Sequence, residues 1–235
     1  MKKGKFLILG ILVLVFGMML VMCDDDSDSS GGGGSSGGTV EYYPADMADR
    51  PTDFSFAYVP PPNSQHVQYP EYSIRPLSDL INGSASITIS GDKVNVNLGT
   101  PKDGYLYDDT LDDEVEEGIV VNPRGVKGWG FEAFCTSDVK YGLICVKKGT
   151  GSYYDRGGIA GLFYADRDLT AKGTYTYESS DGGRHIQTVI YNVSLKKGWN
   201  YFIESEDKEA KTTTYTSSAS FPSGFTWLVA DARNM

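Results

Sequence analysis

From residue 84 to the C-terminus, apolar and polar residues alternate with a period of two. Apolar side chains occupy every second position of residues 84–90, and the alternation resumes in residues 93–98 after Gly91-Asp92. Successive side chains of a β-strand point to opposite faces of the sheet, so this period predicts strands with one buried face. The two runs joined by Gly91-Asp92 predict a β-hairpin with a two-residue loop.

The same pattern continues to the end of the chain, with short loops between the runs. It predicts strands at residues 118–121, 129–136, 139–147, 158–165, 172–179, 184–195, 199–204, 211–218 and 225–230. Because the last five are joined by short connections, we expect them to pair consecutively as a meander. One helical turn is expected, at residues 77–81. The predicted fold class is all-β, an antiparallel two-layer β-sandwich after a disordered N-terminal tether, with a closed β-barrel as the alternative.

The N-terminus carries the pattern of an export signal. Lys2, Lys3 and Lys5 precede the seventeen uncharged residues 6–22. Lysines before an apolar stretch keep that end of the chain in the cytoplasm while the stretch enters the membrane. The remainder of the chain is therefore expected outside the cytoplasm.

The apolar stretch ends at Cys23, and a run of aspartates follows it. A signal segment that ends in a lone cysteine resembles the signal peptide of bacterial lipoproteins, in particular those of spirochaetes. The residues that correspond to the lipobox are Leu20, Val21, Met22 and Cys23. The resemblance implies that residues 1–22 are removed, that the Cys23 thiol is acylated, for example with palmitate, and that the chain is a lipid-anchored membrane protein of the cell envelope, facing the periplasm or the cell exterior. Two alternatives remain open, an uncleaved helical anchor and free secretion after cleavage elsewhere.

Three segments follow the signal. Residues 23–40 are dominated by Asp, Ser and Gly, which cannot bury enough apolar surface to offset their ordering entropy, so they are expected to form a flexible tether. Seven of the ten prolines lie in residues 44–76. Residues 41–83 are therefore expected to pack on the domain as an irregular segment with one short strand near residues 54–58. Residues 84–235 form the predicted β-domain.

The net charge of −10 at pH 7 argues against nucleic acid as a partner, because binding it relies on Lys and Arg. The sequence contains no phosphate-binding loop, dinucleotide fingerprint, metalloprotease motif or paired cysteine motif. We therefore expect no cofactor and no catalytic activity. The two histidines, His66 and His185, are expected at the surface or at a sheet edge.

An acidic run occupies residues 103–117, which contain eight carboxylates and no basic residue. Clustered oxygens suit Ca²⁺, although the spacing differs from that of an EF-hand loop. A solvated acidic loop is the alternative interpretation. The candidate calcium ligands are Asp108, Asp109, Asp112, Asp113 and Glu114.

Two further cysteines, Cys135 and Cys145, lie in strands predicted to form a hairpin around residues 136–139. That hairpin places Cys145 opposite residue 130, about 17 Å along the strand from Cys135, so we expect two unpaired thiols. The chain also contains 16 tyrosines. Most of them alternate with polar residues and are expected to pack in the sheet, whereas Tyr153-Tyr154 is expected at the surface.

Together these features predict a membrane-anchored extracytoplasmic lipoprotein. Its β-sandwich domain is expected to bind a protein or a glycan without catalysis. One alternative is a hydrolase in which paired carboxylates meet in space without a local sequence motif. Another is a structural component of the envelope.

Overall fold

The computed structural model describes residues 35–59, 73–106, 118–131, 133–150, 156–179 and 184–231, and most of them form strands. The elements are β1 (Ser35–Tyr43), β2 (Phe56–Val59), β3 (Ser73–Pro76), α2 (Leu77–Leu80), β4 (Ile81–Ser90), β5 (Lys93–Pro101), the short 3-10 helix η1 (Asp103–Tyr105), β6 (Ile119–Asn122), β7 (Gly128–Phe131), β8 (Phe134–Cys135), β9 (Tyr141–Lys147), β10 (Gly158–Ala165), β11 (Leu169–Ser179), β12 (His185–Leu195), β13 (Gly198–Asp207), β14 (Thr212–Ser218) and β15 (Phe225–Asp231). The predicted helical turn is confirmed as α2. No helix among these residues is long and apolar enough to span a bilayer.

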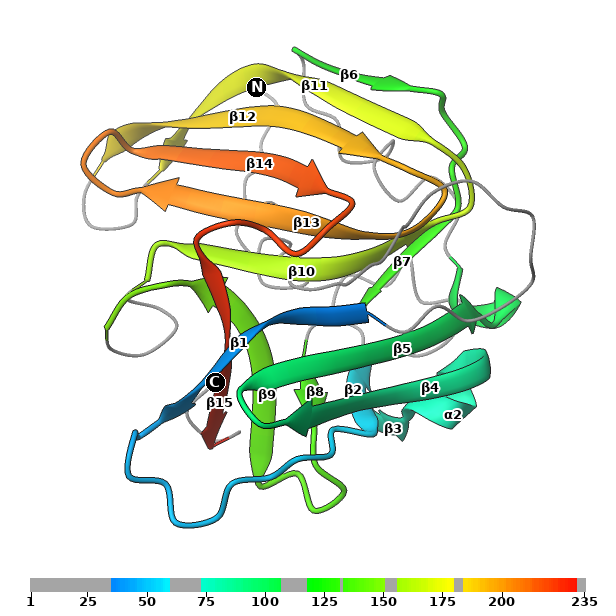
Figure 1. The fold of residues 1–235 in the computed structure, drawn as a ribbon. Helices are drawn as coiled ribbons and strands as arrows, with labels where there is room; N and C mark the ends of the chain where they lie inside the picture. Colours follow the sequence, from blue (N-terminus) through cyan, green and yellow to red (C-terminus); the bar gives the residue numbers. More distant parts are fainter. Residues whose placement is uncertain are drawn as a thin grey trace.

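The strands form one sheet in the order β4-β5-β1-β15-β9-β10-β13-β14-β12-β11-β6. Figure 1 shows that β6, β11, β12, β14, β13 and β10 make one layer, with the remaining strands in a second layer. The side chain of Trp199 on β13 connects the layers, because its Nε1 donates a hydrogen bond of 2.8 Å to the carbonyl of Gly99 on β5. The path begins at β4 and ends at β6, so the sheet is not closed into a barrel. The all-β, sandwich-like fold is therefore confirmed.

Most neighbouring strands are antiparallel, but the predicted meander is wrong. The β11–β12 hairpin forms as predicted, whereas β12 then pairs in parallel with β14, and β13 lies between β10 and β14. The last strand, β15, leaves this layer and pairs with β9 and β1. A short connection limits how far the chain can travel but does not select the neighbour, and alternation with period two reports burial and not the partner strand.

The sheet includes part of the segment predicted as tether. Residues 35–40 belong to β1, which pairs antiparallel with β5 and parallel with β15. The Nε1 atom of Trp227 donates a hydrogen bond of 2.9 Å to the carbonyl of Gly37. The tether prediction is thus wrong for residues 35–40, because a strand of small residues can contribute backbone hydrogen bonds without apolar side chains. Residues 23–34 lie outside the described part of the chain.

The Pro-rich segment also contributes to the sheet. The short strand predicted near residues 54–58 is confirmed as β2, which pairs with both β3 and β8. Phe54, Ala57 and Val59 are fully buried. The prolines therefore restrict this segment to short strands but do not exclude it from the core.

Cys135 and Cys145 are both buried and unpaired, which confirms the prediction of separate thiols. The predicted register was wrong, because Cys135 lies opposite Gly142 and the hairpin contains only the two residues of β8 on that side. Residues 128–131 form β7 and pair with β10 instead. Cys145 is three positions beyond Gly142, about 10 Å along the strand, and lies opposite Trp227.

Candidate functional site

The site residues predicted from sequence all fall outside the described part of the chain. This holds for the lipobox and lipidation site (Leu20, Val21, Met22 and Cys23) and for the candidate calcium ligands (Asp108, Asp109, Asp112, Asp113 and Glu114). His66 and Tyr153-Tyr154 lie outside it as well. Within the described ranges, no three His, Cys, Asp or Glu side chains gather where they could hold a metal ion.

A different cluster forms in the upper layer of Figure 1, across β13, β14 and β12. The strand registers place Glu204 opposite Tyr215, and Tyr215 opposite Tyr191. Directly opposite residues on neighbouring strands point to the same face of a sheet. One carboxyl group and two phenol rings therefore lie in a row, and the rings of Tyr191 and Tyr215 have centroids 4.8 Å apart.

Two more tyrosines of β11 extend this row. Tyr175 and Tyr177 lie opposite Val189 and Gln187, which occupy the same face of β12 as Tyr191. The rings of Tyr175 and Tyr177 are stacked, with centroids 6.2 Å apart. We call this surface the tyrosine face and define it by Tyr175, Tyr177, Tyr191, Tyr215 and Glu204.

The opposite face of the same strands carries threonines. Thr174 and Thr176 alternate with the two tyrosines of β11 and are exposed, and Thr214 and Thr216 flank Tyr215 on β14. Tyr175, Tyr177 and Tyr191 are half-buried and pack against the hydrophobic core, as the sequence predicted. Parity therefore places these four threonines on the face opposite the tyrosines.

Glu204 has the most unusual electrostatic environment of the cluster. Burial raises the pKa of this carboxyl to about 7, the hydrogen bond from the Tyr215 hydroxyl opposes that rise, and the nearby carboxylate of Glu206 adds to it. Burial also raises the pKa of Tyr215 well above its usual range, and the charge of Glu204 adds to that increase. Near neutral pH, the Glu204 carboxyl therefore exists in both protonation states and can either donate or accept a hydrogen bond.

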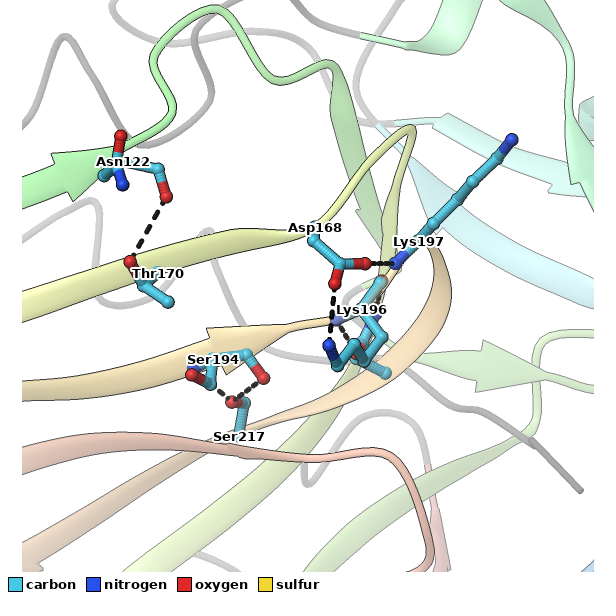
Figure 2. Close-up of polar contacts among 8 residues, drawn as sticks. Asn122, Asp168, Thr170, Ser194, Lys196, Lys197 and Ser217 are labelled. Carbon is cyan, nitrogen blue, oxygen red and sulfur yellow. Dashed lines mark hydrogen bonds and ion pairs between the residues drawn. The ribbon is translucent and has the colours of Figure 1, made fainter. Parts of the chain in front are cut away.

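A second polar cluster joins two turns of this layer. In Figure 2, Asp168 accepts hydrogen bonds from the Nζ atom of Lys196 (2.7 Å) and from the backbone N–H of Lys197 (2.9 Å). The side chain of the buried Asn200 closes the second turn, since its Oδ1 accepts from the N–H of Lys196 at 2.7 Å. The bond from Lys196 lowers the pKa of Asp168. These contacts hold the β10–β11 turn against the β12–β13 turn. We assign them a structural role and no catalytic one.

Neighbouring strands in the same view are joined in a similar way. The hydroxyl of Thr170 donates to the carbonyl of Asn122 at 3.2 Å, and the hydroxyl of Ser217 accepts from the N–H of Ser194 at 2.7 Å (Figure 2). Each side chain bonds the backbone of the adjacent strand. They stabilise the sheet and do not form a recognition site.

Sequence reasoning missed Glu204 because it searched for carboxylates in the acidic run and for local motifs. The available signal was parity, since Phe202 and Glu204 lie on one face of the strand predicted at residues 199–204, and Glu206 continues that face in β13. The tyrosine partners could not be found in this way, because the parallel pairing of β12 with β14 brings Tyr191 beside Tyr215. Comparison of the chain with known proteins found no matching family model, curated protein or solved structure.

Proposed function

We propose that this chain is a membrane-anchored extracytoplasmic lipoprotein whose β-sandwich domain binds a ligand, protein or glycan, without catalysis. The N-terminal sequence supports the anchor, since three lysines, an apolar stretch and Cys23 follow the order of a lipoprotein signal. The observation that carries the binding role is the tyrosine face. Tyrosines provide large, rigid contact area together with a hydroxyl group, and they are enriched at recognition surfaces.

Arrays of immobilised oligosaccharides and peptides test the binding role, with the detergent-solubilised full chain as the probe. We expect Tyr191→Leu to weaken binding about tenfold or more, because truncation of a central aromatic contact costs above 1 kcal/mol. Asn192→Ala is the matched control, since this neighbouring side chain is exposed on the opposite face. An equal loss in both variants with unchanged circular dichroism contradicts the proposal, as does wild-type protein that binds nothing on either array.

A hydrolase is the second candidate, and the environment of Glu204 favours it. A carboxyl whose pKa is raised to about 7 suits a general acid. Glu206 lies two residues along β13 on the same face, about 7 Å away between Cα atoms, so two carboxyl groups share one face as glycosidases require. Release of reducing sugar from a polysaccharide by wild-type protein, and its loss in Glu204→Gln, identifies this function in place of binding.

A further inference from the structure

We propose that Asn82 is a site of spontaneous deamidation in the folded protein, where the backbone nitrogen of Gly83 closes a succinimide ring that water then opens to aspartate or isoaspartate. This modification site goes beyond the proposed binding function and does not depend on it. Three observations support it: the residue pair itself, the backbone of the bulge that contains it, and the open surroundings of both residues.

The residue pair is the one Asn-Gly sequence in the chain. Asparagine is thermally labile because the backbone nitrogen of the next residue can attack the carbon of its side-chain amide. A side chain on that next residue hinders the attack, and glycine has none. Every other asparagine of the chain is followed by a residue that carries a side chain. The sequence therefore selects Asn82 as the asparagine with the least hindered neighbour.

The backbone at this pair departs from the regular ladder. β4 is the first strand of the sheet path, and its register with β5 passes from Asn82 directly to Ala85. Gly83 and Ser84 therefore form a bulge without register partners on β5. A bulge leaves a residue outside the ladder, so its backbone can rotate at a lower cost in hydrogen bonds than that of a paired residue.

Both residues of the pair are open to solvent. Asn82 and Gly83 are exposed, and a Cβ at Gly83 would meet nothing within 4 Å. The φ of Gly83 is +80°, a conformation that glycine adopts readily. The side chain of Asn82 is held weakly, since its Nδ2 donates to the carbonyl of Pro101 at 3.5 Å, which is long for a hydrogen bond. The Gly83 nitrogen can therefore approach the amide carbon without displacing a packed side chain.

The reaction consumes water and releases ammonia. The Gly83 nitrogen loses its proton and bonds to Cγ of Asn82, the Cγ–Nδ2 bond breaks, and ammonia carries the proton away. Water then adds to one of the two carbonyl carbons of the ring and breaks the bond from that carbon to the Gly83 nitrogen. Addition at Cγ gives aspartate, whereas addition at the main-chain carbonyl carbon gives isoaspartate, in which the chain runs through the side chain. Nothing is oxidised or reduced, and either product carries a new carboxylate.

Isoaspartate changes a contact that lies next to the connection between the layers. The main-chain carbonyl of Asn82 lies against Gly99, where a Cβ would overlap its oxygen. In isoaspartate this carbonyl becomes a free carboxylate, and the backbone gains a methylene group. The carbonyl of Gly99 accepts the hydrogen bond from Nε1 of Trp199 that connects the two layers. We therefore expect isoaspartate to weaken this connection and to lower the stability of the domain.

The test follows the purified, detergent-solubilised full chain during incubation at 37 °C and pH 8 in water enriched in ¹⁸O, with a parallel sample in urea. Peptide mass spectrometry locates the new carboxyl group and its oxygen, and electron-transfer fragmentation distinguishes aspartate from isoaspartate. We expect conversion of Asn82, with ¹⁸O in the product, at a rate within about tenfold of the rate in urea. Asn192 is the internal control and should remain unmodified, because it is exposed but pairs with strands on both sides.

Two variants test the assigned chemistry. Gly83→Ala places a methyl group beside the attacking nitrogen and should slow the conversion by about tenfold or more. Because the φ of +80° strains this variant, Asn82→Gln provides a second test: it keeps Gly83 but must close a larger ring, so it should remain unmodified over the same period. Gly91→Ala is the matched control in the same hairpin, with a φ of +63° and nothing within 4 Å of a Cβ, and it should convert as wild type does.

Four results overturn the inference: a native chain that stays unmodified while the sample in urea converts, equal conversion of Asn192, an unchanged rate in both Gly83→Ala and Asn82→Gln, or the same slowing in Gly91→Ala. Urea unfolding of the separated isoaspartate form tests the effect on the layers. We expect its midpoint to be lower than that of fresh protein, and an equal midpoint contradicts the effect on the connection through Trp199.

Discussion

At the scale of single residues, Glu204 differs most from what its position in the sequence suggests. It stands in a run of charged residues at the end of β13, where an exposed carboxylate is the usual outcome. The register instead places it between Ile159 and Tyr215, and this burial raises its pKa to about 7. The folded chain therefore holds a proton on this group at pH values where the unfolded chain has released it.

Glu204→Gln should change the pH dependence of stability. Between pH 4.5 and about 7 the folded state binds more protons at this site than the unfolded state, so the site's contribution to the free energy of unfolding falls as pH rises. The variant lacks this fall and should be more stable than wild type by about 3 kcal/mol at pH 8, with little difference at pH 4.5. Urea unfolding across this range measures both values. Parallel profiles for the variant and wild type would falsify the assigned environment, and Glu178→Gln, which makes the same change in net charge at an exposed position, should follow wild type.

The two buried cysteines should be protected until the domain unfolds. Burial raises the pKa of Cys135 to about 11 and that of Cys145 well above its usual range, so both stay protonated and poorly nucleophilic at pH 8. In a Cys23→Ser background, we expect slow alkylation of the native protein and rapid alkylation of two thiols in urea without reductant. Detection of no free thiol in urea would show a disulfide and contradict the fold described.

Residue burial was predictable from the sequence where it depends on parity alone. The pattern correctly placed Tyr175, Tyr177 and Tyr191 in the sheet. The two cysteines are unpaired as predicted, although the register behind that prediction was wrong. The pattern did not predict the raised pKa of Glu204. That pKa depends on burial, on Tyr215 of a different strand and on Glu206. Alternation within a strand indicates the face on which a side chain lies. The pKa of that side chain depends on its neighbours on other strands.

At the scale of elements, β1 is the clearest departure from the sequence prediction. Its Gly-rich start enters the sheet beside Trp227 and Phe221 instead of remaining in the tether. Gly38 has a φ of +61°, and a Cβ at this position would overlap the ring of Phe221. Glycine is required here because the backbone is left-handed and an aromatic ring covers it.

Gly38→Ala therefore tests whether β1 is part of the folded domain. The control is Gly91→Ala in the β4–β5 turn, where φ is +63° and a Cβ meets nothing within 4 Å. We expect Gly91→Ala to cost about 1 kcal/mol from backbone strain, and Gly38→Ala a further 1–3 kcal/mol, roughly, from the clash with the ring. Chemical denaturation gives both values. If Gly38→Ala is neutral, residues 35–40 are a tether after all.

Hairpins were predictable from the sequence, and long-range pairings were not. The β4–β5 and β11–β12 hairpins form as predicted because each depends on two alternating runs and the turn between them. The parallel pairs β1·β15 and β12·β14 join segments that no turn connects. Which strands pair in this way depends on which strand faces are buried against each other in the complete sheet. The alternation within one strand does not contain that information.

At the scale of the whole molecule, the first and last strands lie next to each other. β1 pairs with β15, so the segment that follows the predicted anchor is fastened directly to the end of the chain (Figure 1). The buried side chain of Arg156 adds a contact to β1, since its Nη1 lies 2.9 Å from the carboxylate of Glu41. The proposed tether therefore spans at most residues 23–34, about 40 Å when fully extended, which would hold the domain close to the membrane.

The proposed anchor makes a direct prediction for Cys23. Growth with a radiolabelled fatty acid should label the wild-type protein, and Cys23→Ser should lose the label because the acylated thiol is absent. Cys135→Ser is the matched control and should retain it, since Cys135 is buried in β8. Equal labelling of wild type and Cys23→Ser would contradict lipidation at Cys23.

The most direct test of the central claim, that Glu204 is a buried carboxyl group in the row of tyrosines, is an isotope-edited NMR titration of the Glu204 side chain, assigned with Glu204→Gln. The account predicts a midpoint of about 7. A midpoint near the ordinary glutamate value of about 4.3 would contradict it.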